Sequence, residues 1–104
     1  MSVIKNGRYV DVWGNVEWFK DGEYHRDDGP ANELSYGTKM WYLNGKLHRE
    51  DGPAIEWHTI GSEWWIDGEK ITEEEFNQWL AKKQLNEKLH STLEEKPEVK
   101  KVKI

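Results

Sequence analysis

Two short segments of the chain contain the side chains that are best suited to chemistry. The first is His25-Arg26-Asp27-Asp28 and the second is His48-Arg49-Glu50-Asp51. An imidazole beside carboxylates can bind a metal ion or transfer a proton, and a guanidinium can bind a phosphate or a carboxylate. Because Gly-Pro-Ala follows each segment, the two are copies of one motif, H-R-x-D-G-P-A.

The duplication argues against a catalytic role for these residues. Residues 25–27 spell the catalytic-loop triplet of protein kinases, but the sequence lacks the glycine-rich loop and the D-F-G motif of that set. His25 and His48 occupy equivalent positions of two copies, so we expect them to bond loop backbone, and we expect no metal and no cofactor. We expect Arg26 and Arg49 to pair with neighbouring carboxylates. No serine, cysteine or lysine lies in a nucleophile motif. The sequence therefore predicts a protein without enzymatic activity, with a small hydrolase as the remoter alternative.

The elements that position these motifs repeat with a period of 23 residues. Trp18, Trp41 and Trp64 are each followed four residues later by a glycine. Copies begin at Gly14, Gly37 and Gly61, and the third copy has Ile71 and Thr72 where the other two have His and Arg. A fixed period of this length is typical of a repeat architecture with an atypical last unit. Residues 9–13 match the closing half of a missing earlier copy.

Each copy predicts a β-hairpin. Residues 16–19, 40–43 and 64–66 are aromatic and β-branched, and each run ends in Asp-Gly or Asn-Gly, which favours a tight turn. The return strands are predicted at residues 31–36 and 54–60, with 9–13 as their N-terminal equivalent. Alternation places the three repeated tryptophans in one column and Phe19, Tyr42 and Trp65 in a column on the other face. Residues 1–71 are thus expected to be a region of antiparallel stacked hairpins.

A C-terminal amphipathic helix is predicted over residues 72–96, giving a mainly β fold capped by a helix. Residues 72–75 read Thr-Glu-Glu-Glu, a capping box, and Pro97 ends the helix. One stripe is formed by Phe76, Trp79, Leu80 and Lys83, and a rotated stripe is formed by Leu85, Leu89 and Leu93. Residues 97–104 are expected to be a mobile charged tail.

Composition excludes several classes of function. The net charge is −5, and residues 1–71 hold eight basic against 13 acidic side chains. An acidic surface disfavours direct binding of nucleic acid or of anionic membranes. The chain has no cysteine, and neither a signal peptide nor a run of about 20 apolar residues is evident. We therefore expect a cytoplasmic protein that associates with neither membrane nor nucleic acid.

The repeat G-x-x-x-W-x-x-[ND]-G-x-x-H, which spans Gly14 to about Leu80, resembles the MORN-repeat family and its variants. More closely, WYLNGKLHREDGPA is similar to a repeat of small proteins of large bacteriophages. The resemblance implies stacked hairpins with a scaffolding, dimerisation or lipid-binding role. It also implies an accessory role in an infected cell, such as blocking a host factor. The motif H-R-x-D-G-P replaces the second glycine pair of MORN units.

The preferred function is a non-enzymatic module that binds another protein, such as a basic host factor. The candidate interface lies on the acidic aromatic sheet and on the rotated leucine stripe, and the leucine stripe could also bind a second copy of the chain. Its residues are Tyr42, Trp57, Trp65, Leu85, Leu89 and Leu93. One alternative is a protein that sequesters a small anionic ligand such as a nucleotide, through His25, Arg26, His48 and Arg49. A structural or dimerisation scaffold is another.

Overall fold

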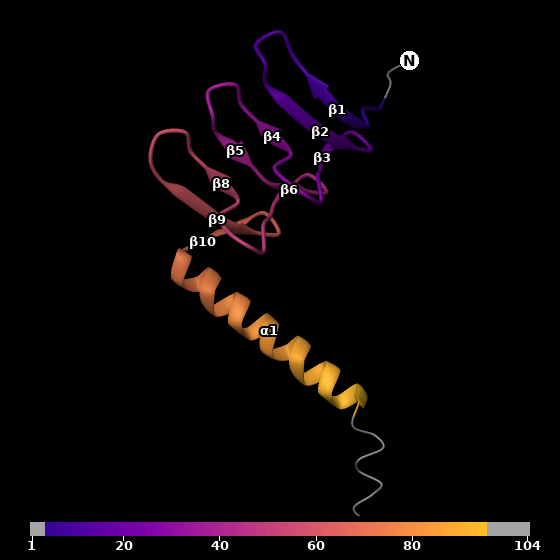
Figure 1. The fold of residues 1–104 in the computed structure, drawn as a ribbon, viewed down its shortest axis with the longest axis vertical. Helices are drawn as coiled ribbons and strands as arrows, with labels where there is room; N and C mark the ends of the chain where they lie inside the picture. The colour runs from indigo at the N-terminus through magenta and orange to yellow at the C-terminus, as the bar shows by residue number, and fades with distance from the viewer. Residues whose placement is uncertain (1–3, 96–104) are drawn as a thin grey trace, which may run out of the picture. The chain divides into compact units, whose positions relative to one another are not determined.

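The chain folds into short antiparallel β-strands followed by one C-terminal α-helix, as Figure 1 shows. The computed structural model describes residues 4–95, and the side chains through residue 89. The described residues divide into two compact units between Glu73 and Glu74. The predicted fold class, mainly antiparallel β with a C-terminal helix, is confirmed.

The first unit contains an eight-stranded sheet and a separate two-stranded hairpin. The main order is β1-β2-β4-β5-β8-β9-β10, with β3 also paired to β2, while β6 pairs β7. The strands are β1 (Gly7–Val10), β2 (Val16–Lys20), β3 (Glu23–Tyr24), β4 (Asn32–Glu33), β5 (Lys39–Met40), β6 (Tyr42–Leu43), β7 (Lys46–Leu47), β8 (Ile55–Glu56), β9 (Ser62–Ile66) and β10 (Glu69–Ile71).

Each copy contributes one tight hairpin, and the predicted turns are confirmed. The hairpins β2–β3, β6–β7 and β9–β10 turn at Asp21-Gly22, Asn44-Gly45 and Asp67-Gly68. The first residue of every turn has a φ of 51°, and the glycine has a φ of 81° to 83°. Two successive positive φ angles define a type I′ turn, which Asn-Gly and Asp-Gly favour.

The return strands are shorter than the sequence predicts. The expected ranges 31–36 and 54–60 contain only β4 and β8, and the equivalent range 9–13 ends its pairing at Val10. Where the first copy passes into the second, the N–H of Gly37 donates to the carbonyl of Leu34, and the N–H of Leu34 donates to the carbonyl of Thr38. Gly37 has a φ of 111°, so the chain leaves the extended conformation and forms a loop.

Alternating side chains of β2 make different contacts on its two faces. On one face, the rings of Phe19, of Tyr24 and of Tyr42 in the separate β6–β7 hairpin follow one another at centroid distances of 5.0 Å, so Tyr24 inserts between two predicted members of the column. Burial, and then a hydrogen bond to Glu17, raise the pKa of Tyr24. On the other face, the rings of Trp18 and Trp41 each contact an arginine guanidinium. Aromatic packing between copies thus supplements a small buried core of Ala31, Ala54 and Ile55.

The N-terminal segment provides the turn of the first copy with a hydrogen-bond acceptor that the later copies receive from the preceding copy. The N–H of Asp21 donates to Oδ1 of Asn6 at 2.8 Å. In the later copies, the equivalent N–H groups of Asn44 and Asp67 donate to Nδ1 of a histidine, at 2.9 Å in both cases. Asn6 therefore supplies to the turn of the first copy the acceptor that a histidine supplies in the later copies.

The second unit contains the helix α1 (Glu73–Glu95), which matches the predicted range to within one residue at each end. Phe76 is buried, Trp79, Leu80 and Lys83 are half-buried, and the rings of Phe76 and Trp79 lie 6.0 Å apart. Within residues 4–95, no helix combines the length and the apolar character needed to cross a bilayer. The predicted mobile tail, residues 97–104, lies outside the described residues.

Candidate functional site

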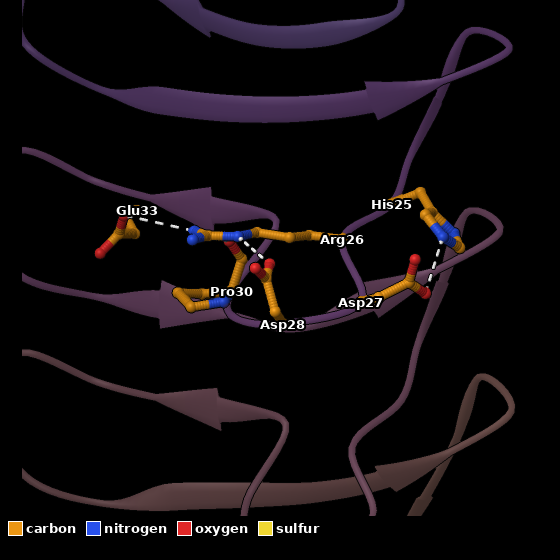
Figure 2. Close-up of polar contacts among 6 residues, drawn as sticks. All are labelled: His25, Arg26, Asp27, Asp28, Pro30 and Glu33. Atoms are coloured by element: carbon orange, nitrogen blue, oxygen red, sulfur yellow. Dashed lines mark hydrogen bonds and ion pairs between the residues drawn. The ribbon is translucent and has the colours of Figure 1, made fainter.

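The connector after each of the first two tight hairpins positions the arginine of the H-R-x-D-G-P motif. In the first copy, Nε of Arg26 donates to Asp28 at 2.9 Å, and Nη1 donates to the carbonyl of Pro30 at 3.2 Å. The guanidinium lies 4.3 Å from the ring centroid of Trp18, and its Nη1 is 4.0 Å from Glu33. Figure 2 shows the side chain extended between Glu33 and Asp28. Arg26 therefore joins the connector to the strand that follows it.

The second copy repeats this geometry with shorter contacts. Arg49 donates to Asp51 at 2.7 Å, to the carbonyl of Pro53 at 3.1 Å and to Glu56 at 2.9 Å. Its guanidinium lies 3.8 Å from the ring centroid of Trp41. These contacts confirm the expectation that both arginines pair with neighbouring carboxylates, and they explain why an arginine rather than a lysine occupies the position.

The glycine of the motif makes room for the guanidinium. A Cβ on Gly29 would lie 2.9 Å from Cζ of Arg26, and a Cβ on Gly52 would lie 3.1 Å from Cζ of Arg49. Both distances are shorter than ordinary carbon contacts. The motif is therefore one structural unit, in which arginine, aspartate, glycine and the proline carbonyl fit together.

The stability that this unit contributes depends on pH through the carboxylate of Asp28. The hydrogen bond from Arg26, and then its positive charge, hold the pKa of Asp28 below its usual value. Because the folded pKa lies below the unfolded value of about 3.9, the pair stabilises the fold above that pH. The contribution is lost as the pH falls through the folded pKa.

Replacing Asp28 with asparagine is expected to flatten the acid end of the stability profile. The variant lacks the carboxylate that must be protonated, so its melting temperature should fall less steeply between about pH 4 and pH 2.5 than that of the wild type. Thermal melts at pH 7, 4 and 2.5 measure the difference. Parallel profiles for the two proteins would show that the Arg26–Asp28 pair adds nothing to stability.

The two histidines of the motif connect neighbouring copies. Nδ1 of His25 accepts the N–H of Asn44, and Nδ1 of His48 accepts the N–H of Asp67. Nε2 of His25 lies 3.1 Å from Asp27, and Nε2 of His48 lies 2.8 Å from Glu50. Since Nδ1 accepts, the proton of the neutral ring is on Nε2, which donates to the carboxylate. Each histidine therefore bonds loop backbone, as the sequence predicts.

These contacts determine what the connectors can do. The four side chains of the alternative ligand site, His25, Arg26, His48 and Arg49, all bond other parts of the array through the contacts described above. Within the described residues, no group of three or more His, Cys, Asp or Glu side chains is arranged to hold a metal ion. An added anion would have to compete with the carboxylates that already form ion pairs with the two guanidinium groups.

The opposite edge of the array is formed by the loops of its three wider hairpins, residues 11–15, 34–38 and 57–61, hereafter the loop edge. Bonds between loops hold them together. Oδ1 of Asn15 accepts the N–H of Ser35 at 2.7 Å, and Oγ1 of Thr38 accepts the N–H of His58 at 3.1 Å. The ring of Tyr36 packs edge-on against that of His58 at 4.5 Å. Figure 1 shows the three loops side by side.

Each loop of the loop edge carries at least one exposed large apolar side chain. Trp13, Tyr36 and Ile60, hereafter the apolar row, directly precede Gly14, Gly37 and Gly61. Their exposed fractions are 73%, 55% and 89%. Val12 and Trp57 of the same loops are also exposed. A single exposed apolar residue is ordinary on a protein surface, whereas exposed apolar residues on three neighbouring loops form a candidate contact surface.

No protein-family model, curated protein or solved structure matches this chain. The geometry of the loop edge and of the connectors therefore carries the functional argument.

The structure separates the predicted interface residues. Tyr42 is half-buried beside Tyr24, and Trp65 is half-buried with its indole N–H donated to Glu63. Trp57 is exposed on the loop edge. On the helix, Leu85 and Leu89 are 55% and 52% exposed. The remaining residue, Leu93, lies outside the residues whose side chains the structure describes.

The apolar row was missed because its members differ in type. The signal that identifies it is positional: each residue immediately precedes the glycine that opens a copy. Alignment of the copies on these glycines brings Trp13, Tyr36 and Ile60 together, although in the strand register Ile60 lies one loop position later than Tyr36. The third copy has one residue fewer between its glycine and its tryptophan, which hides the match when the copies are aligned on their tryptophans.

Proposed function

We propose that this chain is a non-enzymatic protein-binding module whose contact surface is the loop edge. The observation that carries the proposal is the apolar row, one exposed large side chain from each of three stacked loops. Loop-to-loop hydrogen bonds hold these side chains in place before a partner arrives, which reduces the entropy lost on binding. Tryptophan and tyrosine are also the residues that most often dominate binding energy at interfaces.

The partner that suits this surface is a basic protein. Residues 1–71 hold eight basic and 13 acidic side chains, so the array attracts positive charge. Attraction of this kind accelerates association and weakens with added salt. The resemblance to MORN-like repeats of bacteriophage proteins suggests that the partner is a host factor that the module inhibits in the host cytoplasm.

Capture of the partner from host extract tests the proposal. The wild-type chain is compared with the triple variant W13S/Y36S/I60S and with the control variant L85S/L89S, which removes exposed leucines of the helix. We expect the loop variant to capture at least about tenfold less of the partner than the wild type, and the helix variant to capture as much as the wild type. Thermal melts check that both variants remain folded.

Opposite behaviour of the two variants would place the contact on α1 and contradict the proposal. Capture that is insensitive to salt between 50 and 500 mM would contradict the choice of a basic partner, because the screening length of exposed charges falls from about 14 Å to about 4 Å over that range.

A further inference from the structure

The strand β1 lies at the edge of the sheet, as Figure 1 shows. The register makes Tyr9 in β1 equivalent to Asn32 in β4 and to Ile55 in β8. In the sheet order, β4 lies between β2 and β5, and β8 lies between β5 and β9, whereas β1 pairs with β2 alone among the described strands. All four residues of β1 are exposed. An edge strand of this kind offers unpaired main-chain groups to a further strand.

Two residues of β1 direct their main-chain groups to this outer edge. The N–H of Trp18 donates to the carbonyl of Ala31, and the carbonyl of Trp18 accepts the N–H of His25, so both groups point away from β1. Arg8 lies opposite Trp18, and its own N–H and carbonyl therefore point away from β2. Val10, two residues later, has the same orientation. The outer edge thus offers two donors and two acceptors.

The side chain at this edge is an arginine without a carboxylate. The guanidinium groups of Arg26 and Arg49 form ion pairs with aspartates at 2.9 and 2.7 Å. Within residues 4–89, by contrast, the side chain of Arg8 forms no hydrogen bond, ion pair or ring contact. Arg8 is therefore available to a carboxylate from outside the chain.

The charge around β1 is locally positive. Residues 4–10 hold two cations and no carboxylate, and the second cation, Lys5, lies over two aromatic rings at 4.9 and 5.3 Å. The carboxylates of Asp11 and Glu17 in the same hairpin already accept hydrogen bonds, from loop N–H groups and from the hydroxyl of Tyr24. Because charges are screened over about 8 Å at physiological ionic strength, this local charge decides which ligand is favoured at contact.

We propose that the outer edge of β1 binds an acidic, extended segment of another protein, which adds to the sheet as an antiparallel strand. The segment takes the place that β2 has beside β4 and that β5 has beside β8. A carboxylate opposite Arg8 pairs with the guanidinium, and an apolar residue opposite Val10 covers a side chain that is 53% exposed. This surface is separate from the loop edge, so the inference goes beyond the proposed function and does not rest on it.

A second copy of the chain could offer the same edge, but with the wrong charge. If the β1 strands of two copies paired through both outward residues, Arg8 of each copy would lie opposite Val10 of the other. The two arginines would then be diagonal neighbours on one face, and neither would gain a carboxylate. Charge therefore favours an acidic segment over self-association.

Nuclear magnetic resonance titration of the full chain with a synthetic peptide tests the inference. The probe is acetyl-Thr-Thr-Val-Thr-Glu-Thr-Thr-amide, whose valine and glutamate match Val10 and Arg8 in an antiparallel pair. At saturating probe, we expect the amides of Arg8 and Val10 to exchange with solvent at least about fivefold more slowly. The amides of Gly7 and Tyr9 point toward β2 and should change little.

Modified peptides test the charge and the strand geometry separately. Replacing the glutamate of the probe with glutamine should weaken binding at least about threefold, because the guanidinium loses its carboxylate. N-methylation of the valine and glutamate amides, which face β1 in the proposed pair, should abolish binding. N-methylation of the threonine between them, whose amide faces solvent, should not.

Variants of the chain place the contact on β1. R8Q is expected to weaken binding of the probe at least about fivefold, whereas K20Q makes the same charge change on an exposed residue of β2 and should leave binding unchanged. V10P removes an outward N–H without removing a bond to β2, so this variant should fold and lose binding. R8Q alters one exposed side chain and keeps the test valid if V10P fails to fold.

Three results would overturn the inference: equal binding of the glutamine peptide, unchanged binding by folded V10P, or no protection of Arg8 and Val10 by the probe. Protection that rises with protein concentration in the absence of peptide, together with a dimer in sedimentation, would assign the edge to a second copy instead. The triple variant of the loop edge should bind the probe as the wild type does, so failure of the proposed function leaves this result unaffected.

Discussion

Replacing Arg49 with alanine is expected to lower the free energy of unfolding by about 2–3 kcal/mol. The carbonyl of Pro53 loses a donor, and the ring of Trp41 loses a cation at 3.8 Å, each worth about 1 kcal/mol. Asp51 is mostly exposed, so its ion pair adds less than about 1 kcal/mol after solvent screening. Urea denaturation followed by tryptophan fluorescence measures the loss.

Arg26 provides a matched comparison, because it occupies the same motif with longer contacts. Its guanidinium is 4.3 Å from Trp18 and 4.0 Å from Glu33, so the alanine variant should lose only about 1–2 kcal/mol. Equal losses at the two positions would show that contact distance does not determine the contribution.

A double-mutant cycle isolates the role of the motif glycine. Replacing Gly52 with alanine should destabilise the wild type, because the new Cβ meets the guanidinium of Arg49. In the Arg49→Ala background, the same change should be nearly neutral, because the obstacle is gone. A cost that persists in that background would place the constraint in the backbone rather than in the arginine.

Replacing His48 with alanine is expected to cost about 2–4 kcal/mol of unfolding free energy. The ring is 7% exposed, so its removal leaves a cavity. The N–H of Asp67 loses its acceptor at 2.9 Å, and the carboxylate of Glu50 loses one donor at 2.8 Å. The bond to Asp67 joins the second copy to the third, so its loss should also broaden the unfolding transition by uncoupling neighbouring copies.

The chain itself suggests the control for this experiment. Before the first tight hairpin, Asn6 accepts the N–H of Asp21 through its amide oxygen, as His48 accepts the N–H of Asp67 through Nδ1. Replacing His48 with asparagine should therefore recover about 1 kcal/mol relative to alanine, whereas phenylalanine, which has no acceptor, should not recover the hydrogen bond. Equal stability of the asparagine and alanine variants would show that the acceptor is unimportant.

Much of the fold was predictable because the same local signal, a short aromatic strand that ends in Asp-Gly or Asn-Gly, occurs in all three copies. Asp-Gly and Asn-Gly tolerate positive φ at two successive positions, so the tight turns could be located from sequence alone. The helix was predictable because its capping box and apolar stripe are both local signals. The return strands were too long in the prediction, because nothing between Leu34 and Gly37 signals that the strand ends at Glu33.

The candidate site was less predictable, since its residues are defined by neighbours in other copies. The pairing of Arg26 and Arg49 with nearby carboxylates follows from sequence proximity and was predicted. The histidine bonds cross 19 residues, from His25 to Asn44 and from His48 to Asp67, and only the histidines' preference for loop backbone was foreseen. The apolar row requires three loops to lie side by side, which is a property of sheet order rather than of any one copy.

The amino-acid sequence alone determined the period, the tight turns, the helix and the acidic charge of the array, because each depends on residues close together in the chain. The tertiary structure alone decided that Tyr24 enters the aromatic column, that Asn6 replaces a missing histidine, and that Trp13, Tyr36 and Ile60 form one exposed row. These features depend on which strands pair and in what register, and local propensities do not encode the register of distant strands.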